Sequence, residues 1–152
     1  MNPSKRSKSG WKLPRIRELI KDLNAKQQSV PFFAICESWL KPYITNAEIH
    51  IEDYEIFRSD RKKSLHGGVV IYIHKALAID DCEKFDDDCC EGVICRSRIS
   101  NCIIGCIYRP PTAEQHSFKN LLDFINKYFS KHNFDSTMQN FIFGDFNLPH
   151  LK

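Results

Sequence analysis

Short apolar runs alternate with longer amphipathic segments along this 152-residue chain. Leu13, Ile16, Leu19, Ile20 and Leu23 recur at the spacing of a helix that buries one face, and a second stripe of this kind spans 118–129. Apolar runs too short for helices predict strands at 31–36, 54–58, 68–74, 91–96, 101–108 and 141–144. Strands mixed with two flanking helices predict an α/β (α+β) sandwich around a central sheet.

Two connections between these elements have specific sequence signals. Only the polar residues 97–100 separate the strands expected at 91–96 and 101–108, which predicts a hairpin, and Pro110 and Pro111 end its second strand. The stretch 80–91 holds seven carboxylates and a single lysine, Lys84, and is expected to be a solvated loop.

Composition indicates one soluble domain: 42% of the residues are hydrophobic and 27% are charged, and no apolar segment is long enough to cross a membrane. Residues 1–21 carry seven basic groups against Glu18. We expect 1–11 to be a disordered basic tail and 12–152 to be the folded domain. The odd count of seven cysteines and the absence of a signal-type N-terminus favour an intracellular protein with reduced thiols. No C-x2-C pair supports structural zinc.

Three of the apolar runs end in a polar residue that packing does not require. They end in Glu37, in Tyr108, and in Asp145 with Asn147 two positions later. Ligands of α/β sheets gather beyond such strand ends. Glu37, Asp145 and Asn147 offer only hard oxygen donors, which suit Mg²⁺ or Mn²⁺ better than zinc. A carboxylate at a strand exit is also commonly a helix or turn cap, so this alternative stays open at the level of sequence.

Five strings in order along residues 12–150 resemble the endonuclease/exonuclease/phosphatase superfamily, and specifically the endonuclease domain that precedes reverse transcriptase in non-LTR retrotransposons. The strings are ICESWL (35–40), YEIFRSDR (54–61), HGGVVIYI (66–73), IYRPP (107–111) and FGDFNLP (143–149). This resemblance implies the DNase I-like fold, a four-layer α/β sandwich with two packed sheets. It also implies Mg²⁺-dependent hydrolysis of a phosphodiester.

The resemblance assigns a role to each residue at the strand ends. Glu37 would bind the metal ion, one Mg²⁺ or Mn²⁺, and Asp145 would orient or deprotonate the attacking water. Asn147 would hold the scissile phosphate or the metal shell, and Tyr108 would donate its hydroxyl to the phosphate. Arg58, Arg61 and Arg109 are candidates for contacts with DNA phosphates, with ordinary surface charge as the alternative.

Within the retrotransposon branch, the implied activity is a nick in target DNA that leaves a 3′-hydroxyl to prime reverse transcription. The implied partners are DNA and a reverse transcriptase once fused to the domain, the implied location is the nucleus, and no membrane is involved. A lipid or inositol phosphatase of the same superfamily is a more distant alternative.

Two departures from the family pattern concern the ends of the domain. No apolar strand ending in an asparagine precedes the first helix, and no Ser-Asp-His type motif follows the GDFN string. The six histidines are expected at surface or capping positions. We therefore expect a partial sandwich that lacks the first strand and the C-terminal third, with hydrolysis impaired or lost. The alternative function is that of a non-catalytic retroelement remnant, which binds nucleic acid nonspecifically through its basic N-terminal segment.

Overall fold

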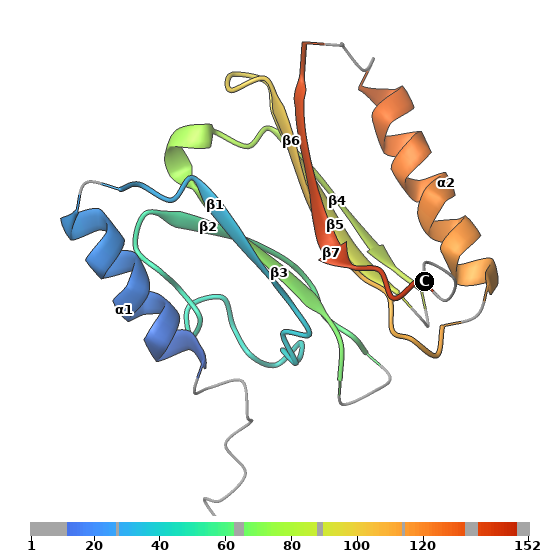
Figure 1. The fold of residues 1–152 in the computed structure, drawn as a ribbon, viewed down its shortest axis with the longest axis horizontal. Coiled ribbons are helices and arrows are strands. Elements are labelled where there is room, and N and C mark those ends of the chain that lie inside the picture. Colours follow the sequence, from blue (N-terminus) through green and yellow to red (C-terminus); the bar gives the residue numbers. More distant parts are fainter. Residues whose placement is uncertain are drawn as a thin grey trace, which may run out of the picture.

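The layers of this protein run from helix to sheet to sheet to helix (Figure 1). The structure is a computed structural model, and it describes residues 12–26, 28–62, 66–87, 90–113, 115–132 and 137–148. The prediction for the basic tail falls on 1–11, which lie outside the described residues. The four-layer α/β sandwich expected from the sequence is confirmed.

The three-stranded sheet has the order β1-β3-β2, with all neighbours antiparallel; its strands are β1 (Phe32–Cys36), β2 (Tyr54–Ser59) and β3 (Val69–His74). The central strand β3 is apolar throughout because both of its faces are covered. Ile71 faces the other sheet, whereas Tyr72 packs with Ile20 of helix α1 (Lys12–Ala25) on the outer side.

The four-stranded sheet has the order β4-β5-β6-β7; its strands are β4 (Asp81–Asp86), β5 (Glu91–Ser97), β6 (Cys102–Tyr108) and β7 (Gln139–Asp145). Strands β5 and β6 form the predicted hairpin. Strand β7 runs parallel to β6, which requires a crossover connection, and helix α2 (Gln115–Lys131) supplies it. Tyr128 of α2 is fully buried against Ile94 and Ile103 of this sheet.

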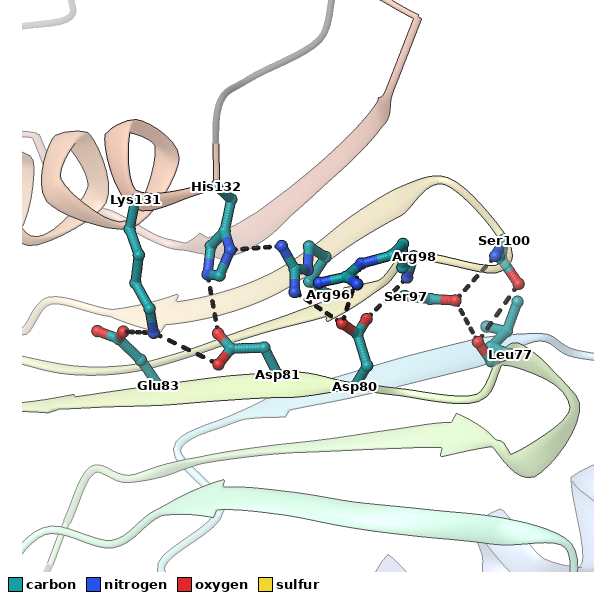
Figure 2. Close-up of polar contacts among 10 residues, drawn as sticks. All are labelled: Leu77, Asp80, Asp81, Glu83, Arg96, Ser97, Arg98, Ser100, Lys131 and His132. Atoms are coloured by element: carbon teal, nitrogen blue, oxygen red, sulfur yellow. Dashed lines mark hydrogen bonds and ion pairs between the residues drawn. The ribbon is translucent and has the colours of Figure 1, made fainter.

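The expectation of a solvated loop at 80–91 is wrong, because Asp81–Asp86 form strand β4 and Glu91 begins β5. The carboxylates of this edge strand meet basic side chains of neighbouring elements, as Figure 2 shows. Asp80 accepts from Arg96 at 2.6 Å, and Lys131 lies 2.6 Å from Glu83. Charged side chains do not prevent an edge strand from pairing with its neighbour in the sheet, here β5. They disfavour pairing of the free edge with another chain.

His132 is also placed differently from the prediction, since its side chain is only 6% exposed. Its Nε2 lies 2.9 Å from Asp81 Oδ2, and its Nδ1 lies 2.5 Å from Arg96 Nη1 (Figure 2). A guanidinium can only donate, so Nδ1 accepts and Nε2–H donates to Asp81. His132 therefore fastens the end of α2 to strands β4 and β5.

Two edge strands lie on one side of the sandwich. Among the described residues, β1 pairs only with β3 and β7 only with β6. The ring of Phe32 lies 5.2 Å from that of Phe141 and 5.6 Å from that of Phe143. Phe143 is 42% exposed, so apolar surface is open along β7. No helix within the described ranges is long and apolar enough to span a membrane.

Candidate active site

The ends of three strands bring the predicted site residues together. Tyr108 ends β6 and is the register partner of Asp145, which ends β7. Glu37 directly follows β1 of the other sheet, and its Oε1 accepts a hydrogen bond from the Tyr108 hydroxyl. Asn147 lies two residues beyond Asp145. The fold thus brings Glu37, Tyr108 and Asp145 together, whereas the side chain of Asn147 bonds the Arg109 carbonyl; the chemical roles of the four residues stay predictions.

Left-handed backbone marks two of these positions. Glu37 has φ 51° and Asn147 has φ 41°, in a region that residues other than glycine seldom adopt. The turn after Glu37 is held by hydrogen bonds from the Ser38 and Trp39 amides to the carbonyls of Gly68 and Gly67, each 3.0 Å long. Backbone of this kind persists where the surrounding structure fixes it, and it clusters at functional sites.

Tyr108 is held as a hydrogen-bond donor. Burial, the hydrogen bond to Glu37 and the charge of that carboxylate raise the pKa of Tyr108 above its ordinary value. The guanidinium carbon of Arg61 lies 5.6 Å from the centre of the Tyr108 ring. At neutral pH the phenol is therefore protonated, and its hydroxyl donates toward the space between the strand ends.

Arg61 is positioned by a buried carboxylate that the sequence did not single out. Glu91 is fully buried and bonds Arg61 through both carboxylate oxygens, with 2.9 Å from Arg61 Nη2 to Oε2. Burial raises the pKa of Glu91, and Arg61 only partly offsets this effect. Gly67 has φ 108°, and a Cβ there would lie 2.7 Å from Arg61 Nε, so only glycine fits beside this pair.

Arg109 holds the backbone of the segment after β7. Its Nη1 donates to the Asn147 carbonyl at 2.7 Å, its Nη2 donates to the Ala113 carbonyl at 2.6 Å, and Asn147 Nδ2 donates back to the Arg109 carbonyl at 2.8 Å. Arg109 is 3% exposed. These bonds fix Asn147 close to the end of β7, which suits a positioning role for Arg109.

Arg58 is also committed to protein groups. It bonds Asp60 at 2.5 Å and the Lys41 carbonyl at 3.0 Å, and its side chain is 10% exposed. The guanidinium groups of Arg58, Arg61 and Arg109 thus all face protein partners; that of Arg61 lies over the Tyr108 ring, and that of Arg109 bonds the Asn147 carbonyl. A contact with DNA phosphate stays a prediction for the three, and it requires that these bonds rearrange.

A thiol pair lies directly beneath the site. Cys36 precedes Glu37, and its Sγ is 3.6 Å from Sγ of Cys106 on β6. The hydrogen bond from Cys106 lowers the pKa of Cys36 to about 7, although burial opposes this shift. Nothing in the sequence indicates that Cys36 meets Cys106 across the two sheets.

The donor chemistry at the strand ends fits a hard divalent cation. Glu37 and Asp145 carry carboxylates and Asn147 carries an amide oxygen, and Mg²⁺ commonly takes one or two protein carboxylates and completes its shell with water and substrate phosphate. No group of three or more His, Cys, Asp or Glu side chains suited to a metal ion occurs in the described part of the chain. The residue types at the strand ends fit such an ion, and Glu37 as its ligand stays a prediction.

The Asp81–His132 pair cannot supply acid–base chemistry to this site. Asp81 pairs with Arg96 at one end of the four-stranded sheet, whereas Tyr108 pairs with Glu91 at the other end. Both ring nitrogens of His132 are occupied. This pair has a structural role in fastening α2.

No protein-family model matches the chain, and no curated protein does. Solved structures with a similar fold include a truncated TDP2 from Caenorhabditis elegans, with a TM-score of 0.56 and 14% identity over 95% of this chain and 58% of that one. Another C. elegans TDP2 structure has a TM-score of 0.56 and 13% identity, over 97% of this chain and 46% of that one. A D. rerio TDP2 humanized by 14 mutations has a TM-score of 0.53 and 14% identity, over 99% of this chain and 65% of that one.

This likeness defines the fold. The chain has the DNase I-like fold, in agreement with its two packed sheets and outer helices. It covers between 46% and 65% of the length of these TDP2 chains. An assignment to the retrotransposon branch of endonucleases goes beyond what the fold shows.

Proposed function

We propose that this chain carries residues of a Mg²⁺-dependent phosphodiesterase site that nicks DNA, of the non-LTR retrotransposon type. One observation carries the proposal: the Tyr108 hydroxyl donates a hydrogen bond to Glu37, and Asp145 is the register partner of Tyr108 on the neighbouring strand. A phenol donor and two carboxylates thus converge beyond the strand ends of a DNase I-like fold. Such a group of side chains suits phosphoryl chemistry, because charge develops on phosphoryl oxygens in the transition state.

Each side chain has a specific task in this proposal. Glu37 holds Mg²⁺ or Mn²⁺, which when bound stabilises negative charge on a phosphoryl oxygen. Asp145 is exposed and accepts a proton from the attacking water. The protonated Tyr108 has a single O–H, which would turn from Glu37 to the phosphate, and Asn147, fixed by Arg109, would orient the phosphate.

The finer assignment rests on the sequence strings. HGGVVIYI and IYRPP resemble the retrotransposon branch more than the lipid and inositol phosphatases of the superfamily. On this assignment the substrate is target DNA, the product is a 3′-hydroxyl that primes reverse transcription, and the site of action is the nucleus. The reverse transcriptase would act as a fused partner.

A plasmid-nicking experiment tests the proposal. The 152-residue chain is incubated with supercoiled DNA and Mg²⁺, and the relaxed product is quantified. We expect slow nicking, in keeping with the impaired hydrolysis expected from the sequence; EDTA should abolish it, and Asp145→Ala should reduce its rate at least about 10²-fold. Asp123→Ala, at an exposed position of α2, is the matched control and should leave the rate unchanged.

Two results would contradict this function. One is nicking that survives both Asp145→Ala and Glu37→Ala in correctly folded variants. The other is an absence of nicking combined with salt-sensitive DNA binding that ignores Mg²⁺ and Glu37→Ala, which would instead favour the non-catalytic nucleic-acid-binding alternative.

A further inference from the structure

Cys36 and Cys106 come from different sheets and meet in the core between them. Cys36 ends β1 of the three-stranded sheet, and Cys106 lies in β6 of the four-stranded sheet (Figure 1). Their sulfur atoms are 3.6 Å apart. Cys106 is fully buried in the core between the sheets, and Cys36 packs against that core while remaining partly exposed.

The geometry is close to that of a disulfide. A disulfide bond is about 2.0 Å long, so the two sulfurs need to approach by about 1.6 Å. Strands β1 and β6 share no hydrogen-bond ladder, because each pairs only within its own sheet among the described residues. Side-chain rotation and a small shift of one sheet on the other can therefore close the gap without breaking backbone pairing.

We propose that Cys36 and Cys106 are an oxidation site, at which a peroxide converts the two thiols into a disulfide that joins the two sheets. The sulfur of Cys36, the more exposed partner, attacks an oxygen of hydrogen peroxide. The O–O bond breaks, and Cys36 becomes a sulfenic acid with release of one water. The sulfur of Cys106 then attacks the Cys36 sulfur, and the S–O bond breaks with release of a second water. Two thiols and one peroxide thus give one disulfide and two waters.

The position of the pair links its redox state to the site. Cys36 immediately precedes Glu37, and Cys106 lies two residues before Tyr108 on the same face of β6. A disulfide would hold together the two strand ends that carry Glu37 and Tyr108. The oxidation itself does not depend on the proposed nicking activity, and it is measured without any nucleic acid.

The experiment is peptide mapping after mild oxidation. The folded chain is treated with hydrogen peroxide, remaining thiols are alkylated, and the digest is analysed by mass spectrometry. We expect a peptide that joins Cys36 to Cys106, lighter by two hydrogen atoms than the two thiol peptides together and lost on reduction. Cys36→Ser and Cys106→Ser should each abolish it, whereas Cys102→Ser, a buried position on the same strand, should retain it.

A second close thiol pair provides an internal comparison. Cys82 and Cys95 lie 3.4 Å apart on paired positions of β4 and β5, within one sheet. Oxidation confined to Cys82 and Cys95, with Cys36 and Cys106 still alkylated, would overturn the proposal. So would a joined Cys36–Cys106 peptide that forms equally in urea-unfolded chain, because folding would then not be what brings the sulfurs together.

Discussion

The hydroxyl of Tyr108 in the four-stranded sheet donates a hydrogen bond to the carboxylate of Glu37 at the end of the three-stranded sheet. This bond crosses from one sheet to the other, so the candidate site is assembled only when the two sheets pack correctly. Glu37 also has a left-handed backbone, which aims its side chain after the strand has ended. The geometry of the site is thus coupled to the core between the sheets.

Tyr108→Phe removes this hydrogen bond and keeps the ring. We expect the nicking rate to fall about 10²- to 10³-fold, as when one donor to a transition-state oxyanion is removed. The free energy of unfolding should fall by only about 1.5–3 kcal/mol, the usual range for a hydrogen bond to a charged group. Tyr43→Phe, at a position that is 77% exposed, is the matched control for both measurements. Equal nicking by the two variants would remove Tyr108 from the site.

Glu91→Ala removes the carboxylate that pairs with the Arg61 guanidinium and leaves a cavity in its place. Since Glu91 is fully buried, we expect a loss of about 3–5 kcal/mol in the free energy of unfolding, measured with urea. The double variant Arg61→Met/Glu91→Leu should recover most of this loss, because it removes both charges and refills the volume. Asp86→Ala breaks the exposed pair with Lys62 and should have a far smaller effect. Similar losses for Glu91→Ala and Asp86→Ala would contradict this account.

Sequence patterns predicted the strands whose two faces are both covered. Strands β3, β5 and β6 are nearly continuous apolar runs, and their expected bounds agree with the structure to within about two residues. The pattern does not predict strand β4 because its charges hide the alternation, and the lysines that pair with its carboxylates, Lys131 of α2 and Lys62, belong to other segments. A pattern along one segment carries no information about such partners.

The sequence pattern also predicted part of the candidate site. Polar residues at strand ends singled out Glu37, Tyr108 and Asp145, and the fold brings them together. The partners of Arg61 and Arg109 depend on long-range contacts, and the sequence alone indicated only their positive charge. Glu91 falls both in the predicted loop at 80–91 and in the predicted strand at 91–96, and neither pattern indicates that Arg61 is its partner.

Acid should weaken the attachment of α2 to the four-stranded sheet. Burial tends to raise the pKa of Asp80 and Asp81, but hydrogen bonds from Arg96 and Lys131 respectively outweigh it, and both pKa values are lowered. A lowered folded-state pKa stabilises the protein above the unfolded value of about 3.9, and this stability is lost as the pH falls through the folded value. We therefore expect a fall in the free energy of unfolding below about pH 4.

Urea unfolding at about pH 7 and about pH 3 measures this effect. Asp80→Asn/Asp81→Asn should narrow the stability difference between the two pH values, because the variant no longer carries these carboxylates (Figure 2). Asp22→Asn, at an exposed position of α1, is the control. An unchanged pH dependence in the double variant would show that other carboxylates dominate acid unfolding.

The open edge at β7 should promote self-association. Phe143 is 42% exposed on a strand that pairs on only one side within the described residues. Phe143→Lys places a charge on this edge and should lower the associated fraction in sedimentation or light-scattering measurements. Ile99→Lys adds the same charge at a position that is 83% exposed in the β5–β6 turn, away from the edge. If both variants reduce association equally, net charge rather than the strand edge is responsible.

Gly144 allows β7 to approach β6 closely just before Asp145. A Cβ at this position would lie 2.2 Å from the carbonyl oxygen of Ile107 and 3.3 Å from its Cα, and backbone atoms in a sheet cannot move aside easily. We expect Gly144→Ala to destabilise the protein by about 1–3 kcal/mol. It should also lower nicking, because it separates Asp145 from its partner Tyr108. Gly92→Ala is the matched control: its nearest neighbour is a side-chain carbon of Ile107 at 3.5 Å, an ordinary contact, so the substitution should be nearly neutral. Equal stability and equal nicking of the two variants would show that close packing at Gly144 does not position the end of β7.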